Sequence, residues 1–151
     1  MIEKKNQILR KGIFDRASAN SSNRFSLRNC LIRDIESLLN NSTRSASLEL
    51  NNYTFVQDSV LNYGIPLLSQ KSDSKKSIMD NAVHIKKIIE IYEPRMEAKY
   101  LNVTPVLNKD YNHILAVIYR IDGLINLSDY TEALSFSVAL DYSCGAFNVV
   151  D

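Results

Sequence analysis

The chain has 151 residues, a formal net charge of +1 and an ordinary mixture of 45% hydrophobic and 23% charged residues. This length fits one domain with a sizeable core, and so small a net charge gives no signal for nucleic acid or anionic lipid. The apolar runs are too short for a transmembrane segment and the start lacks the apolar region of a signal peptide, so a cytoplasmic location is expected. With four glycines and no phosphate-binding or GxSxG motif, nucleotide binding and serine hydrolysis are disfavoured. No cofactor or metal is expected.

Residues 1–25 are predicted to form an N-terminal arm and loop, followed by a single domain over residues 26–151. The arm is basic, and a small apolar and charged cluster at residues 13–16 is expected to pack. The two cysteines, Cys30 and Cys144, have no partner at metal-binding spacing and are expected to be reduced thiols.

Two stretches have the three-and-four spacing of an amphipathic helix. The first runs from an N-cap at Ser26 to a stop at residues 40–41, and the second from an N-cap at Ser77 to Glu93. Their apolar faces are Leu27, Cys30, Leu31, Ile35, Leu38 and Leu39, and Ile78, Ala82, Ile85, Ile88, Ile89 and Tyr92. Between them, residues 59–66 predict a short helical turn closed by Gly64 in a left-handed conformation.

The second helix ends at a charged junction, Tyr92-Glu93-Pro94-Arg95-Met96. Proline cannot extend the helix, so Glu93 is predicted to be its last or nearly last residue. Three runs of strand-like residues follow, at residues 101–107, 114–124 and 133–142, and Pro105 marks the first as an edge strand. The sequence therefore predicts an α+β fold with N-terminal helices packed on a C-terminal three-stranded antiparallel β-meander.

Glu93 is the best candidate for a catalytic residue. It would be the general acid of a glycosidase that uses two carboxylates, with Asp122 or Asp141 as the second. However, nothing in the spacing brings either aspartate to Glu93, and Arg95 favours the ionised carboxylate. An ion pair that fixes the turn or meets a partner is therefore the preferred interpretation.

Neither His84 nor His113 has an acidic or thiol ligand at metal-binding spacing, so both are expected to be structural or solvated. Most tyrosines should serve the core, although Tyr53, Tyr63 and Tyr130 are candidate interface anchors.

The order of several motifs resembles the TssE family, baseplate subunits of bacterial type VI secretion systems that are similar to the lysozyme-like wedge proteins of contractile phage baseplates. The matching motifs are Ile13-Phe14-Asp15-Arg16, the helix of residues 26–41, residues 59–66, the Glu93-Pro94-Arg95 junction, Tyr119-Arg120-Ile121-Asp122-Gly123-Leu124 and Leu140-Asp141-Tyr142-Ser143-Cys144-Gly145. They depart from the family only mildly, with Met96 where leucine is usual and Cys144 within a Ser-Gly turn.

The resemblance implies a structural, non-enzymatic role in the cytoplasm, at the cytoplasmic side of the inner membrane. Such a subunit would bind TssF and TssG in the baseplate wedge, near TssK and the VgrG hub, and would start the TssB/TssC sheath by strand addition. Glu93, Pro94 and Arg95 would then be partner-binding residues, and truncating Glu93 or Arg95 would leave the fold near wild type. The alternatives are the same role in a phage tail or another contractile injection machine, and a peptidoglycan-cleaving enzyme that uses Glu93.

Overall fold

The computed structural model describes residues 24–43, 45, 48–50, 52–66, 75–106, 116–127 and 130–150. Of the arm expected over residues 1–25, residues 24 and 25 belong to the first helix described below and the rest, including the cluster at residues 13–16, lies outside the described residues. His113 also lies outside them.

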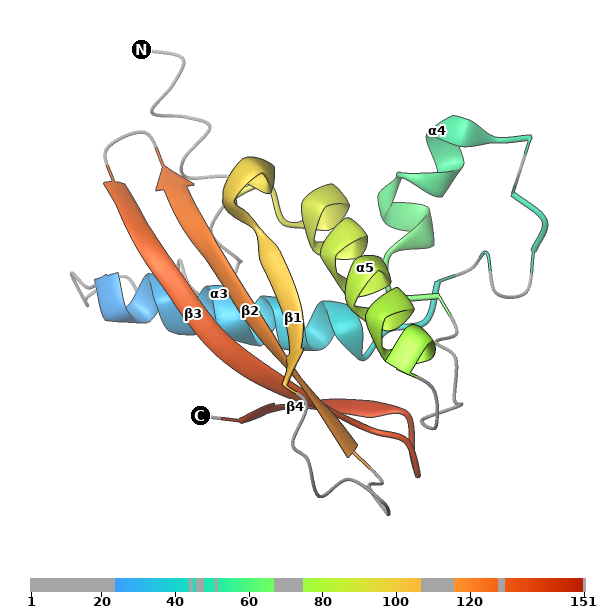
Figure 1. Ribbon diagram of the computed structural model, residues 1–151. Helices are drawn as coiled ribbons and strands as arrows, with labels where there is room; N and C mark the ends of the chain where they lie inside the picture. Colours follow the sequence, from blue (N-terminus) through green and yellow to red (C-terminus); the bar gives the residue numbers. More distant parts are fainter. Residues whose placement is uncertain are drawn as a thin grey trace, which may run out of the picture.

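The described chain is α+β, as predicted, but its sheet has four strands (Figure 1). The helices are α3 (Arg24–Leu39), α4 (Thr54–Gln57) and α5 (Lys75–Tyr92), with short 3-10 turns η2 (Val60–Asn62) and η3 (Ala98–Tyr100). The strands are β1 (Asn102–Val106), β2 (Ala116–Leu127), β3 (Tyr130–Asp141) and β4 (Ala146–Val150), paired antiparallel in the order β1-β2-β3-β4. The prediction of three strands was wrong because β4 is too short to show a clear alternation and follows β3 through a tight turn.

Both long helices begin earlier than their expected caps, since Ser26 and Ser77 lie inside α3 and α5. Their ends agree better with the prediction: α3 stops before Asn40, and α5 stops at Tyr92, one position before Glu93. No helix among the described residues is long and apolar enough to cross a membrane.

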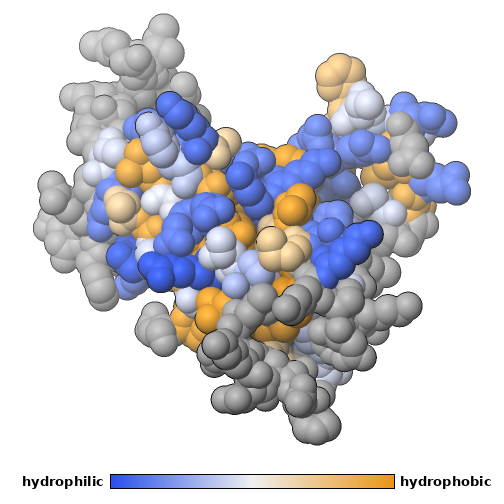
Figure 2. All heavy atoms as spheres, viewed as in Figure 1, coloured by the Kyte–Doolittle hydropathy of each residue, from blue (hydrophilic) through white to orange (hydrophobic). Residues whose placement is uncertain are grey.

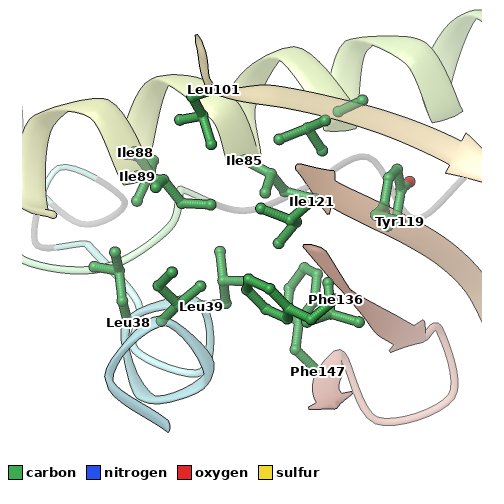
Figure 3. Packing of buried hydrophobic residues seen from close by; sticks show 14 of the residues in the cluster. Leu38, Leu39, Ile85, Ile88, Ile89, Leu101, Tyr119, Ile121, Phe136 and Phe147 are labelled. Carbon is green, nitrogen blue, oxygen red and sulfur yellow. The ribbon is translucent and has the colours of Figure 1, made fainter. Parts of the chain in front are cut away.

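The helices cover one face of the sheet, and their apolar stripes meet it in one core (Figure 3). Leu38 and Leu39 of α3 and Ile85 and Ile89 of α5 converge on side chains of β2, β3 and β4, including Ile121, Phe136 and Phe147. α5 packs along β1, whereas α3 packs against β3 and β4. Alternate residues of β3 face the helices, because Leu134, Phe136, Val138 and Leu140 are all buried.

Glu36 of α3 and Asn40, which directly follows α3, cover the outer edge of β4. The Asn40 amide donates to the Phe147 carbonyl at 2.8 Å and its oxygen accepts from the Phe147 N–H at 2.9 Å, while Glu36 Oε1 accepts from the Val149 N–H at 3.0 Å. These contacts bind backbone groups that face away from β3. An edge that would otherwise be open to another strand is therefore closed by the chain itself.

Gly64 has a positive φ of 129°, as predicted, and sits against the end of α3. A Cβ atom built at Gly64 would lie 2.3 Å from the Asn41 carbonyl oxygen, which itself accepts from the Ile65 N–H at 2.7 Å. The contact holds residues 64–65 against the chain that leaves α3. Only glycine satisfies both the backbone angle and the space.

We predict that Gly64→Ala destabilises the protein by about 2–4 kcal/mol, from backbone strain together with a clash against backbone that cannot move aside. The matched control is Gly145→Ala, because Gly145 also has positive φ (71°) but a Cβ there would meet nothing within 4 Å. The control should lose only about 1–2 kcal/mol. Urea denaturation of both variants measures the difference, and equal losses would contradict the packing argument.

Candidate functional site

The candidate site is the corner between α5 and β1, where Glu93, Pro94 and Arg95 follow one another. The Glu93 N–H still bonds the Ile89 carbonyl at 2.8 Å, and the Glu93 carbonyl accepts from the Met96 N–H at 3.1 Å, which closes a four-residue turn around Pro94. Pro94 is exposed, while Glu93 and Arg95 are buried. Proline thus ends the helix, and the turn directs both charged side chains inward.

The corner is fixed to the edge of β2, beyond the end of β1. The Arg95 carbonyl accepts from the Asn126 N–H at 2.9 Å, and the Glu97 N–H donates to the Leu124 carbonyl at 3.0 Å. Met96 lies over Gly123, whose missing side chain leaves room for the Met96 methyl group. The glycine in the motif of β2 therefore serves this contact.

The two buried charges form a close two-point ion pair. Arg95 Nε lies 2.6 Å from Glu93 Oε1 and Arg95 Nη2 lies 2.5 Å from Glu93 Oε2, while the Arg95 backbone N–H also donates to Oε1 at 3.1 Å. The same Nη2 group donates to Asp34 Oδ2 of α3 at 2.7 Å. Such planar, paired geometry is the strongest form of charge-assisted hydrogen bonding, and here it joins α3 to the corner.

Arg95 stays charged despite its burial. Desolvation lowers the pKa of the guanidinium, but the hydrogen bonds and negative charges of Glu93 and Asp34 outweigh it and raise that pKa above its ordinary value. Arg95 and Glu93 are only 7% and 5% exposed. Removal of Arg95 would therefore leave Glu93 buried without a compensating charge, whereas removal of Glu93 would leave Arg95 with Asp34 alone.

Two tyrosines connect the corner to the segment before α5. The rings of Tyr63 and Tyr92 meet edge to face with centroids 5.4 Å apart, and the Tyr92 hydroxyl donates to the Asn62 carbonyl at 2.8 Å. Burial, followed by the charges of Asp34 and Glu93, raises the pKa of Tyr63. Burial is also the largest cause of the raised pKa of Tyr92. Tyr63 therefore lies close enough to the ion pair to respond to its charges, whereas the Tyr92 hydroxyl is held by backbone carbonyls of the segment before α5.

Asp122 and Asp141, the second carboxylates considered from the sequence, form hydrogen bonds with other residues than Glu93 and Arg95. Asp122 accepts from Arg120 at 3.1 Å and from Ser135 at 2.6 Å on the face of the sheet opposite the described helices. Asp141 caps the β3–β4 turn, where hydrogen bonds from Ser143 lower its pKa. In the part of the chain that is described, no group of three or more His, Cys, Asp or Glu side chains could hold a metal ion.

Of the remaining candidates, Tyr53 and His84 are exposed and Tyr63 borders on the ion pair. The side chain of Tyr130 lies outside the described part of the structure. Sequence reasoning missed Asp34, because a single acidic residue on the polar side of a helix carries no sign that it contacts Arg95, 61 positions away.

The protein is a small α+β domain, and the charged side chains of its α5–β1 corner are bound by other groups of the same chain. The family model described as baseplate wedge protein gp25 matches residues 26–130, so the chain belongs to that family, which includes TssE. The resemblance noted from the motifs is thereby confirmed, and a structural role in the baseplate of a contractile injection machine follows. No curated protein and no solved structure matches the chain significantly.

Truncation of Glu93 or Arg95 was expected from the sequence to leave the fold near wild type. Because both residues are buried, we now expect it to destabilise the fold. We predict that Arg95→Ala lowers the free energy of unfolding by about 3–5 kcal/mol, because Glu93 would be left buried and unpaired. The matched control is Arg120→Ala, which removes an exposed arginine whose pair with Asp122 is solvated, and should cost less than about 1 kcal/mol. Urea unfolding followed by circular dichroism provides the measurement. Similar stabilities for the two variants would contradict the assignment.

Proposed function

We propose that the protein is the TssE-like structural subunit of a type VI secretion baseplate, without catalytic activity. In this role it binds TssF and TssG in the wedge, near TssK and the VgrG hub, and starts the TssB/TssC sheath on the cytoplasmic side of the inner membrane. Family membership and the order of its motifs support this role. A phage tail or another contractile injection machine is the alternative setting, and the genes next to this one distinguish the two.

The observation that carries the proposal is one open stretch of strand edge. A sheath strand can add only where backbone N–H and C=O groups face away from the sheet. β4 pairs with β3 only over residues 137–141, so the earlier half of β3 extends beyond it. Alternation along an antiparallel pair places the outward groups of β3 at residues 131, 133 and 135.

The other strand edges in the described part of the chain are less suited to an added strand, because they are bound by the chain itself or lack an N–H donor. Asn40 and Glu36 bind the outward groups of β4, and β1 carries Pro105, which has no N–H to donate. The corner itself pairs with β2 beyond β1. The Ser135 carbonyl accepts from Arg28 Nη2 at 2.9 Å, but the outward groups of Thr131 and Ala133 have no partner among the described residues. Strand addition is therefore best supported at residues 131–133.

The contacts of Glu93 give the alternative of a peptidoglycan-cleaving enzyme little support. Both carboxylate oxygens are held by Arg95, so neither is directed to a substrate. A general acid also needs a site that opens to its substrate, and Glu93 is only 5% exposed. Partner binding at the corner is best tested at Pro94, since it is the exposed residue of the three.

The strand-addition proposal predicts that Ala133→Pro abolishes sheath assembly in cells, because it removes an outward N–H from β3 and no bond within the sheet. The matched control, Ala133→Val, keeps that N–H and should assemble sheaths normally. Fluorescence microscopy of labelled TssB counts the sheaths, and co-purification with TssF and TssG tests wedge binding, which both variants should retain. Normal sheath numbers with Ala133→Pro would refute strand addition here, whereas loss of TssF and TssG from wild type would refute the wedge role.

A further inference from the structure

Glu132 is a carboxylate on the helix-facing side of β3, within the strand edge considered above. Its side chain shares this side with Leu134 and Phe136, because residues two apart along a strand point to the same face. Glu132 is half-buried, and its Oε2 atom is buried without a hydrogen-bond partner among the described residues. A buried polar atom of this kind is unfavourable unless a partner is supplied.

Glu132 ends a row of side chains that crosses the sheet. Met96 pairs with Ile125 of β2, and Ile125 pairs with Glu132 of β3. Met96 and Ile125 are 5% and 1% exposed, so the row is apolar up to its last member. A strand added to the edge of β3 would extend this row by one side chain, directly beside the carboxylate.

The register of β3 brings that added side chain close. The backbone groups of Thr131 and Ala133 point to the added strand, so Glu132 lies between them at a position whose own backbone groups face β2. In an antiparallel pair, facing residues at such a position have the shorter Cα–Cα distance, about 4.5 Å. The facing side chain would therefore contact the Glu132 carboxylate.

The charges on the helix-facing side of this edge favour a cation. Arg28 Nη2 donates to the Ser135 carbonyl at 2.9 Å, further along β3, and forms no ion pair with Glu132 in the described part of the chain. Met96 and Ile125, the other members of the row, are uncharged. Glu132 is thus the charge that the facing side chain of an added strand would meet first.

The opposite side of the sheet adds no comparable preference. Thr131, Ala133 and Ser135 are exposed there, and the Asp122 carboxylate is bound by Arg120 and Ser135. Figure 2 views this side and shows hydrophilic and hydrophobic residues interspersed over it. The helix-facing side therefore distinguishes one added strand from another.

We propose that the strand added at residues 131–133 carries a lysine or arginine that faces Glu132 and pairs with its carboxylate. Opposite charges that face each other across two strands are favourable, whereas like charges are unfavourable. The cation would also fix the register, because a shift by one residue turns it to the other face. This inference rests on the strand addition proposed above and names the chemistry of the partner.

The test is an NMR titration of the isotope-labelled full chain with the end-capped peptide Thr-Val-Thr-Lys-Thr-Val-Thr, whose symmetric sequence lets lysine face Glu132 in either strand direction. Matched peptides carry glutamine or glutamate at the centre. The lysine peptide should shift amide signals of residues 131–133 and bind about five-fold or more tightly than the glutamate peptide, with the glutamine peptide between them. Equal affinities, or no saturable binding of the lysine peptide at these residues, would overturn the inference.

Variants of Glu132 test whether this side chain makes the selection. Glu132→Lys should reverse the preference, so that the glutamate peptide binds about five-fold or more tightly than the lysine peptide. Glu132→Gln should abolish the preference without lowering thermal stability, because it keeps the size of the side chain. The matched control, Asp122→Asn, changes a carboxylate on the opposite side and should still prefer lysine. A lysine preference that persists in Glu132→Lys, or is lost in the control, would contradict the assigned position.

Ala133→Pro separates this inference from strand addition itself, and it should bind none of the three peptides. If wild type binds all three equally and Ala133→Pro binds none, strand addition stands and the selection of a cation is wrong. If Ala133→Pro binds the peptides like wild type, the assigned strand edge is wrong, and the inference fails with it.

Discussion

The structure depends on the buried pair of Glu93 and Arg95 and on its extension to Asp34. Taking two charges out of water costs several kcal/mol for each, and the loss is recovered only because the guanidinium meets the first carboxylate at two points and the second at 2.7 Å. These bonds have strict directions, unlike apolar contacts. We therefore infer that these bonds fix the orientation of α3, the end of α5 and the edge of β2 relative to one another.

That orientation has consequences at the sheet edges. With α3 held at Asp34, Glu36 of α3 and Asn40, which directly follows α3, bind the backbone of β4 and close its outer side. The corner covers β2 beyond β1 in the same way. The early half of β3 is then the stretch that we propose for strand addition.

Much of this fold could be predicted from the sequence. The stripes of α3 and α5 and the alternation of β3 identified the core, and Pro94 located the corner because proline acts through its own backbone. The sequence did not predict contacts between distant residues: Asp34 on Arg95, Asn40 on Phe147 and Tyr92 on Asn62 all depend on how helices and sheet pack. β4 was missed because five residues carry little periodicity. The burial of Glu93 and Arg95 was missed because charged residues are normally exposed.

The central claim is that Glu93 and Arg95 act as one structural unit, and a double-mutant cycle measures this most directly. The free energy of unfolding would be determined for wild type, Glu93→Leu, Arg95→Met and the double variant. We predict that each single change is strongly destabilising, whereas the double variant recovers much of the loss because neither charge is left unpaired, giving a coupling free energy above about 2 kcal/mol. A coupling near zero, with additive losses, would contradict the account.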